Sequence, residues 1–454
     1  MFVKGFNRLY TKIMDNVFVR NLMTLSFGSA VAQMIPFFAT MVLSRLYSPA
    51  QMGEWGVFSS YASILAILGC LRYDGAIIRA KKEVDAYNIV SLSLALALLF
   101  TFVLYLVAFL ITWLDISVQL DTGAVFMLPL YVLVMLLIQI LLNLSTYLRA
   151  YKLIATNSIN RSLSQCAARI ALGCVHINKG MVIGSVIGAI TSAYTLGHKL
   201  KVLSCIKLMD TKRMLEVAKE NLDFPKYDLP SNLLNSISSH CPPILLAYYY
   251  QEQTVGLFSM AYTLLYIPMS LVGSSISQLF YKNASELHNR GESIAGLTKT
   301  LFMSLYLLGV LFMIFMVFTE GWLFGFLLGE KWIAAGRFAC LLSPWLLTVT
   351  AFSPISPVFY IKKKQHVNMI LNLIGIIFRF TSFIVAAMLL QTSEWTIMIF
   401  AFVSTLMIIL SGCFVFYISD VKLRISDKLL IIFSTIIFVV LYSWKSHSIL
   451  CQIA

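Results

Sequence analysis

Residues 157–175, NSINRSLSQCAARIALGCV, combine two arginines with two amides at a spacing that a helix brings together. Four polar residues recur at every fourth position and therefore share one face of an α-helix: Asn157, Arg161, Gln165 and Arg169. Guanidinium groups bind phosphate oxygens through paired hydrogen bonds, and amides both donate and accept hydrogen bonds. This face is therefore suited to a ligand that carries phosphate.

The rest of the chain is strongly apolar. It has 454 residues, of which 59% are hydrophobic and 12% are charged. Apolar runs of about 20 residues recur along the whole length, and each can cross about 30 Å of hydrocarbon as a helix. The sequence predicts an all-α polytopic membrane protein with spans near residues 22–45, 55–78, 87–112, 122–149, 153–176, 181–203, 225–250, 254–281, 300–320, 336–360, 366–390, 395–418 and 428–444.

The placement of the basic residues predicts the orientation of these spans. Most of the 34 Lys and Arg residues fall in segments on the same side as the N-terminus, and three fall inside spans, namely Arg161, Arg169 and Arg379. The positive-inside rule then predicts a cytoplasmic N-terminus. The formal net charge of +14 is accounted for by orientation, and we expect no nucleic-acid partner.

The eight cysteines are scattered and form no CxxC pair or Cys/His cluster. The sequence therefore predicts neither a disulfide framework nor a metal site.

The chain is predicted to contain two similar halves. The stretches LYSPAQMGEW (46–55) and YYQEQTVGLF (249–258) align without gaps, pairing Gly53 with Gly256, and each joins the first two spans of its half. Parallel repeats of six spans are a transporter architecture, with the substrate between the halves. The expected organisation is an amphipathic interfacial segment (1–21), an N-terminal six-helix lobe (22–203), a cytoplasmic linker helix (204–224), a C-terminal six-helix lobe (225–420) and an extra C-terminal span (421–454).

Further polar stripes occur on other predicted spans. Because polar faces are costly against lipid, they are expected to face one another or water. Together they predict a hydrophilic cavity whose lining includes Gln33, Gln139, Asn143, Asn157, Gln165, Asn368 and Asn372. The alternative is that such residues tie helices together by hydrogen bonds, and the sequence leaves both open.

The three arginines within spans predict that this cavity is positively charged. The acids fall in loops or near span ends, with Asp74, Asp228 and Glu394 closest to the interior. Without a carboxylate at mid-span, Arg161, Arg169 and Arg379 are predicted to bind an anion, and guanidinium groups fit phosphate oxygens well. The alternatives are that these side chains snorkel to the interface or bond to helix carbonyls.

Four passages resemble the Wzx-type polysaccharide flippases of the multidrug/oligosaccharidyl-lipid/polysaccharide (MOP) exporter superfamily. They are RNLMTLSFGSAVAQMIPFFATMVLSRLYSPAQMGEWGVFSSYASI (20–64), LRYDGAII (71–78), VGLFSMAYTLLYIP (255–268) and LGEKWIAAG (328–336). The resemblance implies two pseudo-symmetric six-helix lobes, and the thirteenth span departs from that plan. It also places LRYDGAII at the inner end of the second helix, so Arg72 and Asp74 are expected at the cytoplasmic entrance.

The resemblance further implies the function. The chain is expected to move undecaprenyl-pyrophosphate-linked oligosaccharide, an O-antigen or capsule repeat unit, from the cytoplasmic to the periplasmic leaflet of a bacterial inner membrane by alternating access. The implied partners are that glycan lipid, membrane lipid, the polysaccharide polymerase and the chain-length machinery. No cofactor is expected, and a proton or sodium ion is the candidate coupling ion.

Two other functions are weaker expectations. A multidrug exporter of the same superfamily is the alternative, although cationic drugs would require carboxylates in the cavity. An enzyme such as a glycan polymerase or ligase would need a sizeable outer loop with an acid–base constellation. The predicted outer connections are short, so we expect the protein not to be an enzyme.

Overall fold

The computed structural model describes residues 17–116, 118–200 and 210–451. Most of the predicted interfacial segment 1–21, and residues 204–209 of the predicted linker, lie outside this part. Within it, every element is a helix and no strand occurs. The predicted all-α fold class is therefore confirmed.

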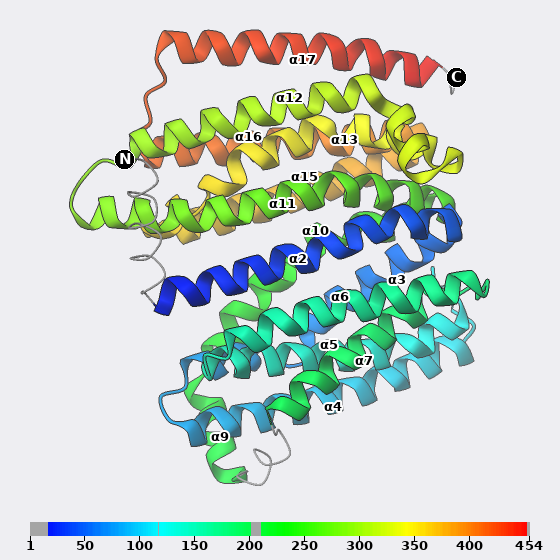
Figure 1. The fold of residues 1–454 in the computed structure, drawn as a ribbon, viewed down its shortest axis with the longest axis vertical. Helices are drawn as coiled ribbons and strands as arrows, with labels where there is room; N and C mark the ends of the chain where they lie inside the picture. Colours follow the sequence, from blue (N-terminus) through cyan, green and yellow to red (C-terminus); the bar gives the residue numbers. More distant parts are fainter. Residues whose placement is uncertain (1–16, 117, 201–209, 452–454) are drawn as a thin grey trace, which may run out of the picture. The chain divides into compact units, whose positions relative to one another are not determined.

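Each of the thirteen predicted spans falls on a helix (Figure 1). Among the described residues, eight helices are long and apolar enough to cross a membrane, or nine when α3 and the 3-10 helix η1, which are bent by 59°, form one span. That thirteen helices cross the membrane stays a prediction.

The chain divides into two compact units. Unit 1 comprises Met1–Tyr47 and Glu54–Ile244, and unit 2 comprises Ser48–Gly53 and Leu245–Ala454. The division falls inside helix α10, directly after its Pro242–Pro243 pair. The first part of α10 therefore belongs to unit 1, whereas the predicted C-terminal lobe begins at residue 225.

The helices of unit 1 are α2 (Val17–Leu46), α3 (Pro49–Leu68) from Glu54 onward, η1 (Tyr73–Arg79), α4 (Glu83–Trp113), α5 (Thr122–Tyr147), α6 (Tyr151–Cys174), α7 (Gly180–Lys199), α9 (Thr211–Glu220), η2 (Phe224–Asp228) and the first part of α10 (Leu229–Tyr249). Their apolar core lies among α3, η1, α4, α5 and α7, with Phe58, Ile77, Ile89, Leu136 and Ile140 fully buried. Helix α6 is different because it is the most polar of the long helices and packs between α2 and α7.

The linker helix α9 is fixed to unit 1 at the N-terminal end of α4. Arg213 binds Asp85 of α4 at 2.8 Å, and the Tyr73 hydroxyl of η1 donates a hydrogen bond to the carbonyl of Ala218 at 3.2 Å. Hydrogen bonds to Asp85 and Glu216 raise the pKa of Arg213 above its ordinary value. The described part of the linker is thus held against α4 and η1 of unit 1.

The helices of unit 2 are α11 (Glu252–Asn289), α12 (Ala295–Leu328), η3 (Glu330–Trp332), α13 (Ile333–Phe352), η4 (Ser353–Ile355), α14 (Val358–Ile361), α15 (Gln365–Leu390), α16 (Ser393–Ile418) and α17 (Ile425–Cys451). Helix α13 is the centre of this unit and packs against α11, α12 and α16. Helix α17 packs on α12, where Tyr306 and Thr435 share a hydrogen bond of 2.6 Å and Lys299 pairs with Asp427.

The aligned glycines of the two halves meet inside unit 2. A Cβ on Gly53 would lie 2.0 Å from the carbonyl oxygen of Glu252, and a Cβ on Gly256 would lie 1.7 Å from that of Pro49. The ungapped alignment pairs Pro49 with Glu252 as well as Gly53 with Gly256. The first turns of α3 and α11 therefore cross with a local twofold symmetry that supports the predicted repeat.

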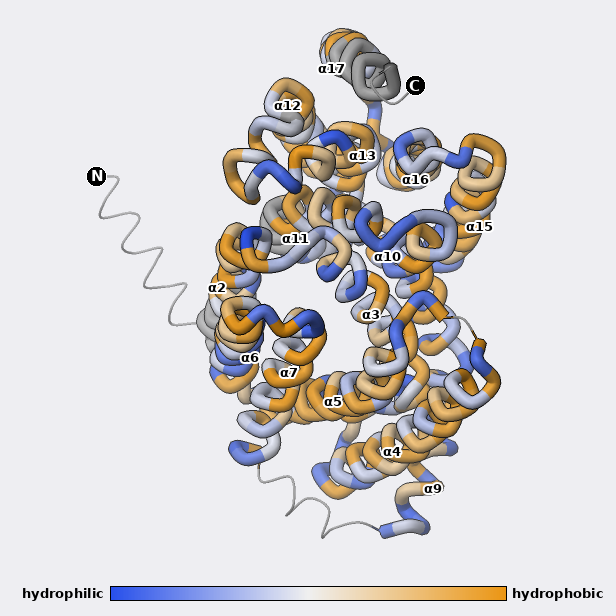
Figure 2. Tube along the Cα trace, turned by 90° about the vertical axis from the view of Figure 1, so that its right-hand side faces the viewer, coloured by the Kyte–Doolittle hydropathy of each residue, from blue (hydrophilic) through white to orange (hydrophobic). Residues whose placement is uncertain are grey.

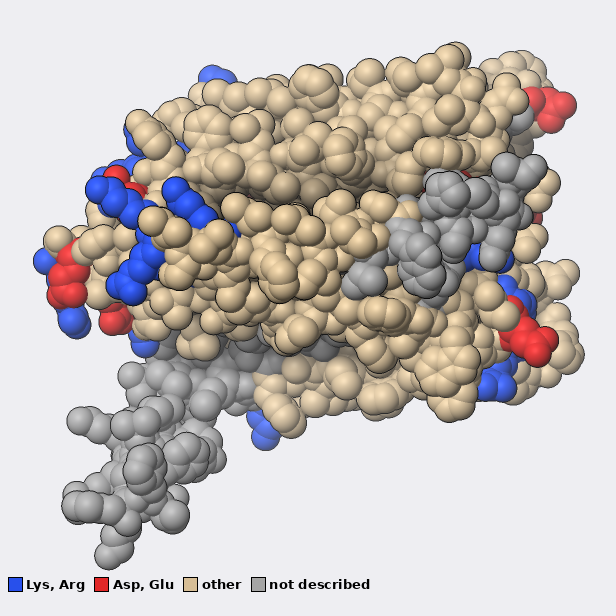
Figure 3. Space-filling view, turned by 90° about the horizontal axis from the view of Figure 1, so that it is seen from above, with Lys and Arg blue, Asp and Glu red and all other residues tan. Residues whose placement is uncertain are grey.

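The outer surfaces of the helices are apolar. On α4, exposed residues include Leu98, Leu99, Phe102 and Phe109, and hydrophilic positions gather at helix ends and turns (Figure 2). Figure 3 shows a broad band without charged residues across the visible face, with Lys, Arg, Asp and Glu at its two ends. This distribution is that of a multi-pass membrane protein.

Candidate functional site

The polar face of α6 is the first element of the candidate site. Helix α7 approaches α6 closely because it carries small residues: a Cβ on Gly184 would lie 2.7 Å from Cγ of Arg169, and one on Gly188 would lie 2.5 Å from Cβ of Gln165. Small residues allow helix backbones to approach closely within a membrane. The close approach places the hydroxyl groups of α7 within reach of polar side chains on α6.

Arg169 is buried in this contact, with 8% of its surface exposed. Its Nε donates a hydrogen bond to Ser185 Oγ of α7 at 3.0 Å, and its Nη2 donates to the same oxygen. The guanidinium carbon lies 4.4 Å from the ring centre of Trp55, a cation–π arrangement. Because the Tyr47 hydroxyl also donates to the Arg169 carbonyl at 2.7 Å, this residue ties α2, α3 and α7 to α6.

Asn157, at the other end of the face, also joins α6 to α7 by hydrogen bonds. It is 3% exposed, donates to Ser192 Oγ at 2.8 Å and accepts from Thr195 Oγ1 at 2.6 Å. The sequence left open whether stripe residues line a cavity or tie helices together. For Asn157 and Arg169, the contacts in this structure tie helices together.

Arg161 and Gln165, between these two, are only partly buried. Within the described residues, the Arg161 side chain forms no ion pair or hydrogen bond with another side chain, and it lies within electrostatic range of Arg169. Arg161 is therefore a cation on the α6 face that no carboxylate of the described residues neutralises. It is the arginine of this helix whose guanidinium can accept an anion without breaking a bond within the protein.

A second cluster surrounds Asp74 of η1. The amide groups of Gln139 and Asn143 on α5 each donate to Asp74 Oδ2 at 2.8 Å, and Arg72 Nη1 lies 3.9 Å from the same oxygen. Asp74 is 1% exposed. The sequence placed this carboxylate near the end of a span, whereas the bend between α3 and η1 folds it into the core. In this conformation, Gln139 and Asn143 contact a carboxylate of the protein.

The remaining predicted residues lie on other helices. Gln33 is a partly buried residue of α2 in unit 1. In unit 2, Arg379 of α15 is partly buried and lies within electrostatic range of Tyr262 on α11. On the same helix, Asn368 is partly buried and Asn372 is exposed. That these side chains and the α6 face bind one ligand stays a prediction.

Sequence reasoning missed the partners on α7 and α3. Ser185, Ser192 and Trp55 complete the environment of the α6 face, yet none belongs to a predicted polar stripe. The spacing of Gly180, Gly184 and Gly188 at every fourth residue was the available signal, because it indicates a close helix–helix contact.

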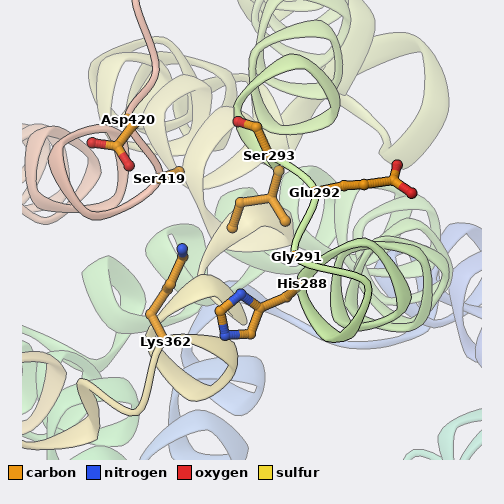
Figure 4. Close-up of a pocket in the computed structure, with 8 residues that line it drawn as sticks. His288, Gly291, Glu292, Ser293, Lys362, Ser419 and Asp420 are labelled. Carbon is orange, nitrogen blue, oxygen red and sulfur yellow. The ribbon is translucent and has the colours of Figure 1, made fainter.

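Unit 2 contains a small open pocket of about 310 Å³ (Figure 4). It is lined by residues from the connections α11–α12, α14–α15 and α16–α17. His288 and Lys362 line it together with the acids Glu292 and Asp420. Acids and bases balance in this lining, so it lacks the cationic character that the predicted pyrophosphate site requires. None of the predicted site residues lies in it.

No group of three or more His, Cys, Asp or Glu residues in the described part of the chain could hold a metal ion. That the protein works without a cofactor stays an expectation.

Comparison with known proteins identifies the family. The family model described as "Polysaccharide biosynthesis protein" matches residues 42–337, while no curated protein sequence matches.

Three solved structures with similar folds are a flippase and two transporters. The lipid II flippase MurJ in an inward closed conformation has a TM-score of 0.68 at 12% identity, covering 94% of this chain and 99% of MurJ. An inward-facing multidrug resistance MATE family transporter of the MOP superfamily has a TM-score of 0.57 at 13% identity, covering 86% and 95%. A MOP superfamily transporter from Pyrococcus furiosus has a TM-score of 0.53 at 14% identity, covering 89% and 96%.

The family match covers more than half of the chain, and the fold extends over almost all of it. These proteins are transporters and flippases rather than catalytic enzymes. The chain therefore belongs to the polysaccharide biosynthesis protein family, and its fold is similar to that of the lipid II flippase MurJ and of MOP superfamily transporters.

Proposed function

We propose that the protein is a flippase that moves an undecaprenyl-pyrophosphate-linked oligosaccharide, an O-antigen or capsule repeat unit, from the cytoplasmic to the periplasmic leaflet. It works in a bacterial inner membrane by alternating access, with its N-terminus in the cytoplasm. Membership of the polysaccharide biosynthesis family carries this proposal, and the fold shared with a lipid II flippase supports it.

Arg161 is the residue of α6 that first binds the pyrophosphate in this proposal. Its guanidinium is partly exposed and has no carboxylate partner within the described residues, and a planar guanidinium matches phosphate oxygens in pairs. Arg379 is the corresponding cation proposed in unit 2, and the polar residues Gln33, Gln165, Asn368 and Asn372 are proposed to contact sugar. Arg169 contributes positive charge to the same face but does not contact the ligand in this proposal, because its Nε and Nη2 donors are directed at Ser185.

Reconstituted protein tests this role. Vesicles carrying a fluorescent polyprenyl-pyrophosphate oligosaccharide report translocation when the label becomes accessible to an impermeant quencher. Arg161→Ala should slow translocation by about tenfold to a hundredfold, the effect of losing hydrogen bonds to a charged group, with unchanged thermal stability. Arg161→Lys should restore part of the rate because it keeps the charge and loses the fork.

The matched control is Lys152→Ala, which removes an exposed cation from the same helix and should leave the rate unchanged. Equal rates for wild type and Arg161→Ala would remove Arg161 from the mechanism. Absence of translocation in the wild type, combined with extrusion of a cationic dye, would favour the multidrug exporter instead.

A further inference from the structure

The buried carboxylate of Asp74 has no role in the binding scheme above. We propose that Asp74 takes up and releases the proton that couples to transport, and that its charge decides how firmly Arg72 holds Asp228. This inference rests on the proposed function and names the coupling ion for it. The observation behind it is a fully buried acid whose direct hydrogen-bond partners are two neutral amides.

The geometry leaves the charge of Asp74 incompletely matched. Gln139 Nε2 and Asn143 Nδ2 donate to its Oδ2 at 2.8 Å. Arg72 directs its Nε to Asp228 Oδ2 at 2.8 Å and leaves its Nη1 3.9 Å from Asp74. A buried carboxylate is costly unless it is paired and hydrogen-bonded. Because Arg72 is engaged more closely elsewhere, proton uptake removes a buried charge without breaking a close ion pair.

The two amides suit both charge states of the acid. In this structure both donate N–H to Asp74 Oδ2, an arrangement that suits the ionised carboxylate. When the proton adds to a carboxylate oxygen, the new O–H needs an acceptor. Rotation of the Gln139 or Asn143 side chain presents its carbonyl oxygen for this purpose. A lysine or arginine at either position would stabilise only the ionised form.

The surrounding charges have partners of their own. On η1, Arg79 pairs with Asp223 at 2.5 Å. On α4, Asp85 binds Arg213 of the linker helix, and the Cys70 thiol donates to the carbonyl of Ser93. On η2, Lys226 lies over the ring of Tyr227, and on α5 the facing polar groups are the two amides. Arg72 and Asp228 are thus the charged groups that can respond to Asp74.

Arg72 connects this charge to the backbone. Leu71 and Arg72 have φ values of 48° and 62°, which residues other than glycine adopt at a cost, and they form the bend between α3 and η1. Asp228 directly precedes α10, the helix that continues from unit 1 into unit 2. Protonation of Asp74 leaves Asp228 as the carboxylate that Arg72 holds, which tightens the link between this bend and α10.

Infrared difference spectroscopy of the purified full-length protein tests directly whether Asp74 binds and releases a proton. As the pH changes, the wild type should show the carbonyl band of a protonated carboxylic acid appearing and disappearing. Asp74→Asn, which keeps the shape, should lose this band. Asp223→Asn, which removes an exposed acid of the same region, should retain it, and Asp74→Glu should retain it at a shifted frequency. A band that persists unchanged in Asp74→Asn overturns the inference.

Flux measurements separate this inference from the proposed function. In the vesicle assay, an imposed gradient of about one pH unit should shift the leaflet distribution by up to about tenfold for one proton per cycle. Asp74→Asn should show no shift. An equal shift in Asp74→Asn, or a shift driven by sodium alone, overturns the proton role and leaves the flippase intact. A titrating Asp74 band without translocation in any variant overturns the flippase and leaves Asp74 as a proton site.

Discussion

Helices α6 and α15 carry similar polar stripes, yet the two units use them differently. On α6, Asn157 and Arg169 are buried and bonded to hydroxyl groups of α7. On α15, Asn372 is exposed and forms no hydrogen bond with another described residue. The neighbours explain the difference, because α7 offers small residues and hydroxyls, whereas Gly375 of α15 faces the apolar side chain of Met407 on α16. The partner helix, rather than the stripe, decides what a polar residue does.

Among the variants that test this comparison, removal of Arg169 should lower the stability of the protein most. Arg169→Ala deletes charge-assisted hydrogen bonds and a cation–π contact, so it should destabilise the protein by about 3 kcal/mol. Thermal unfolding in detergent measures the change, with Arg161→Ala as the control on the same face that should unfold like the wild type. If both variants unfold alike, the packing role of Arg169 is refuted.

Widening the contact between α6 and α7 should have the next largest effect. Gly188→Ala places a Cβ 2.5 Å from that of Gln165, so we expect a loss of about 2 kcal/mol from overpacking. The matched control is Gly296→Ala on α12, where no atom lies within 4 Å of an added Cβ. An equal melting temperature for the two variants would mean that the two helices are not closely packed.

The smallest changes in stability are expected when one amide on α6 and one on α15 are replaced. Asn157→Ala should lower stability by about 1 kcal/mol, since it removes two hydrogen bonds and leaves Ser192 and Thr195 without their partner. Asn372→Ala should stay within about 0.5 kcal/mol, as is usual for exposed positions. Denaturation of the two variants side by side provides the measurement. A larger loss for Asn372→Ala would reverse the comparison between α6 and α15.

Much of the fold could be predicted because apolar length and charge placement are local properties. Every predicted span falls on a helix, and the weak alignment of residues 46–55 with 249–258 identified the glycines that meet in unit 2. The division of the chain was harder to predict. The charged linker resembles a hinge, but Arg213 and Tyr73 hold its described part against unit 1, and the division falls within α10.

Of the candidate site, the sequence could predict only which polar residues share a helix face, and not which neighbours they contact. Spacing placed Arg161 and Arg169 on one side of α6, but it could not distinguish the partly exposed arginine from the buried one. Eight residues separate them, and the difference arises from Ser185 and Trp55, which lie on other helices. The burial of Asp74 was equally hidden, because a turn with positive φ directs it inward.

The sequence by itself determined that this chain is a helical membrane protein and which residues share a helix face. These properties follow from hydrophobic length and helical periodicity, both of which are local. Only the tertiary structure decided that Arg169 and Asn157 tie helices together, that Arg161 has no carboxylate partner in the described part of the chain, and that Asp74 is buried beside Arg72. Hydrogen bonds and burial depend on which helices become neighbours, and residues far apart in the chain settle that choice.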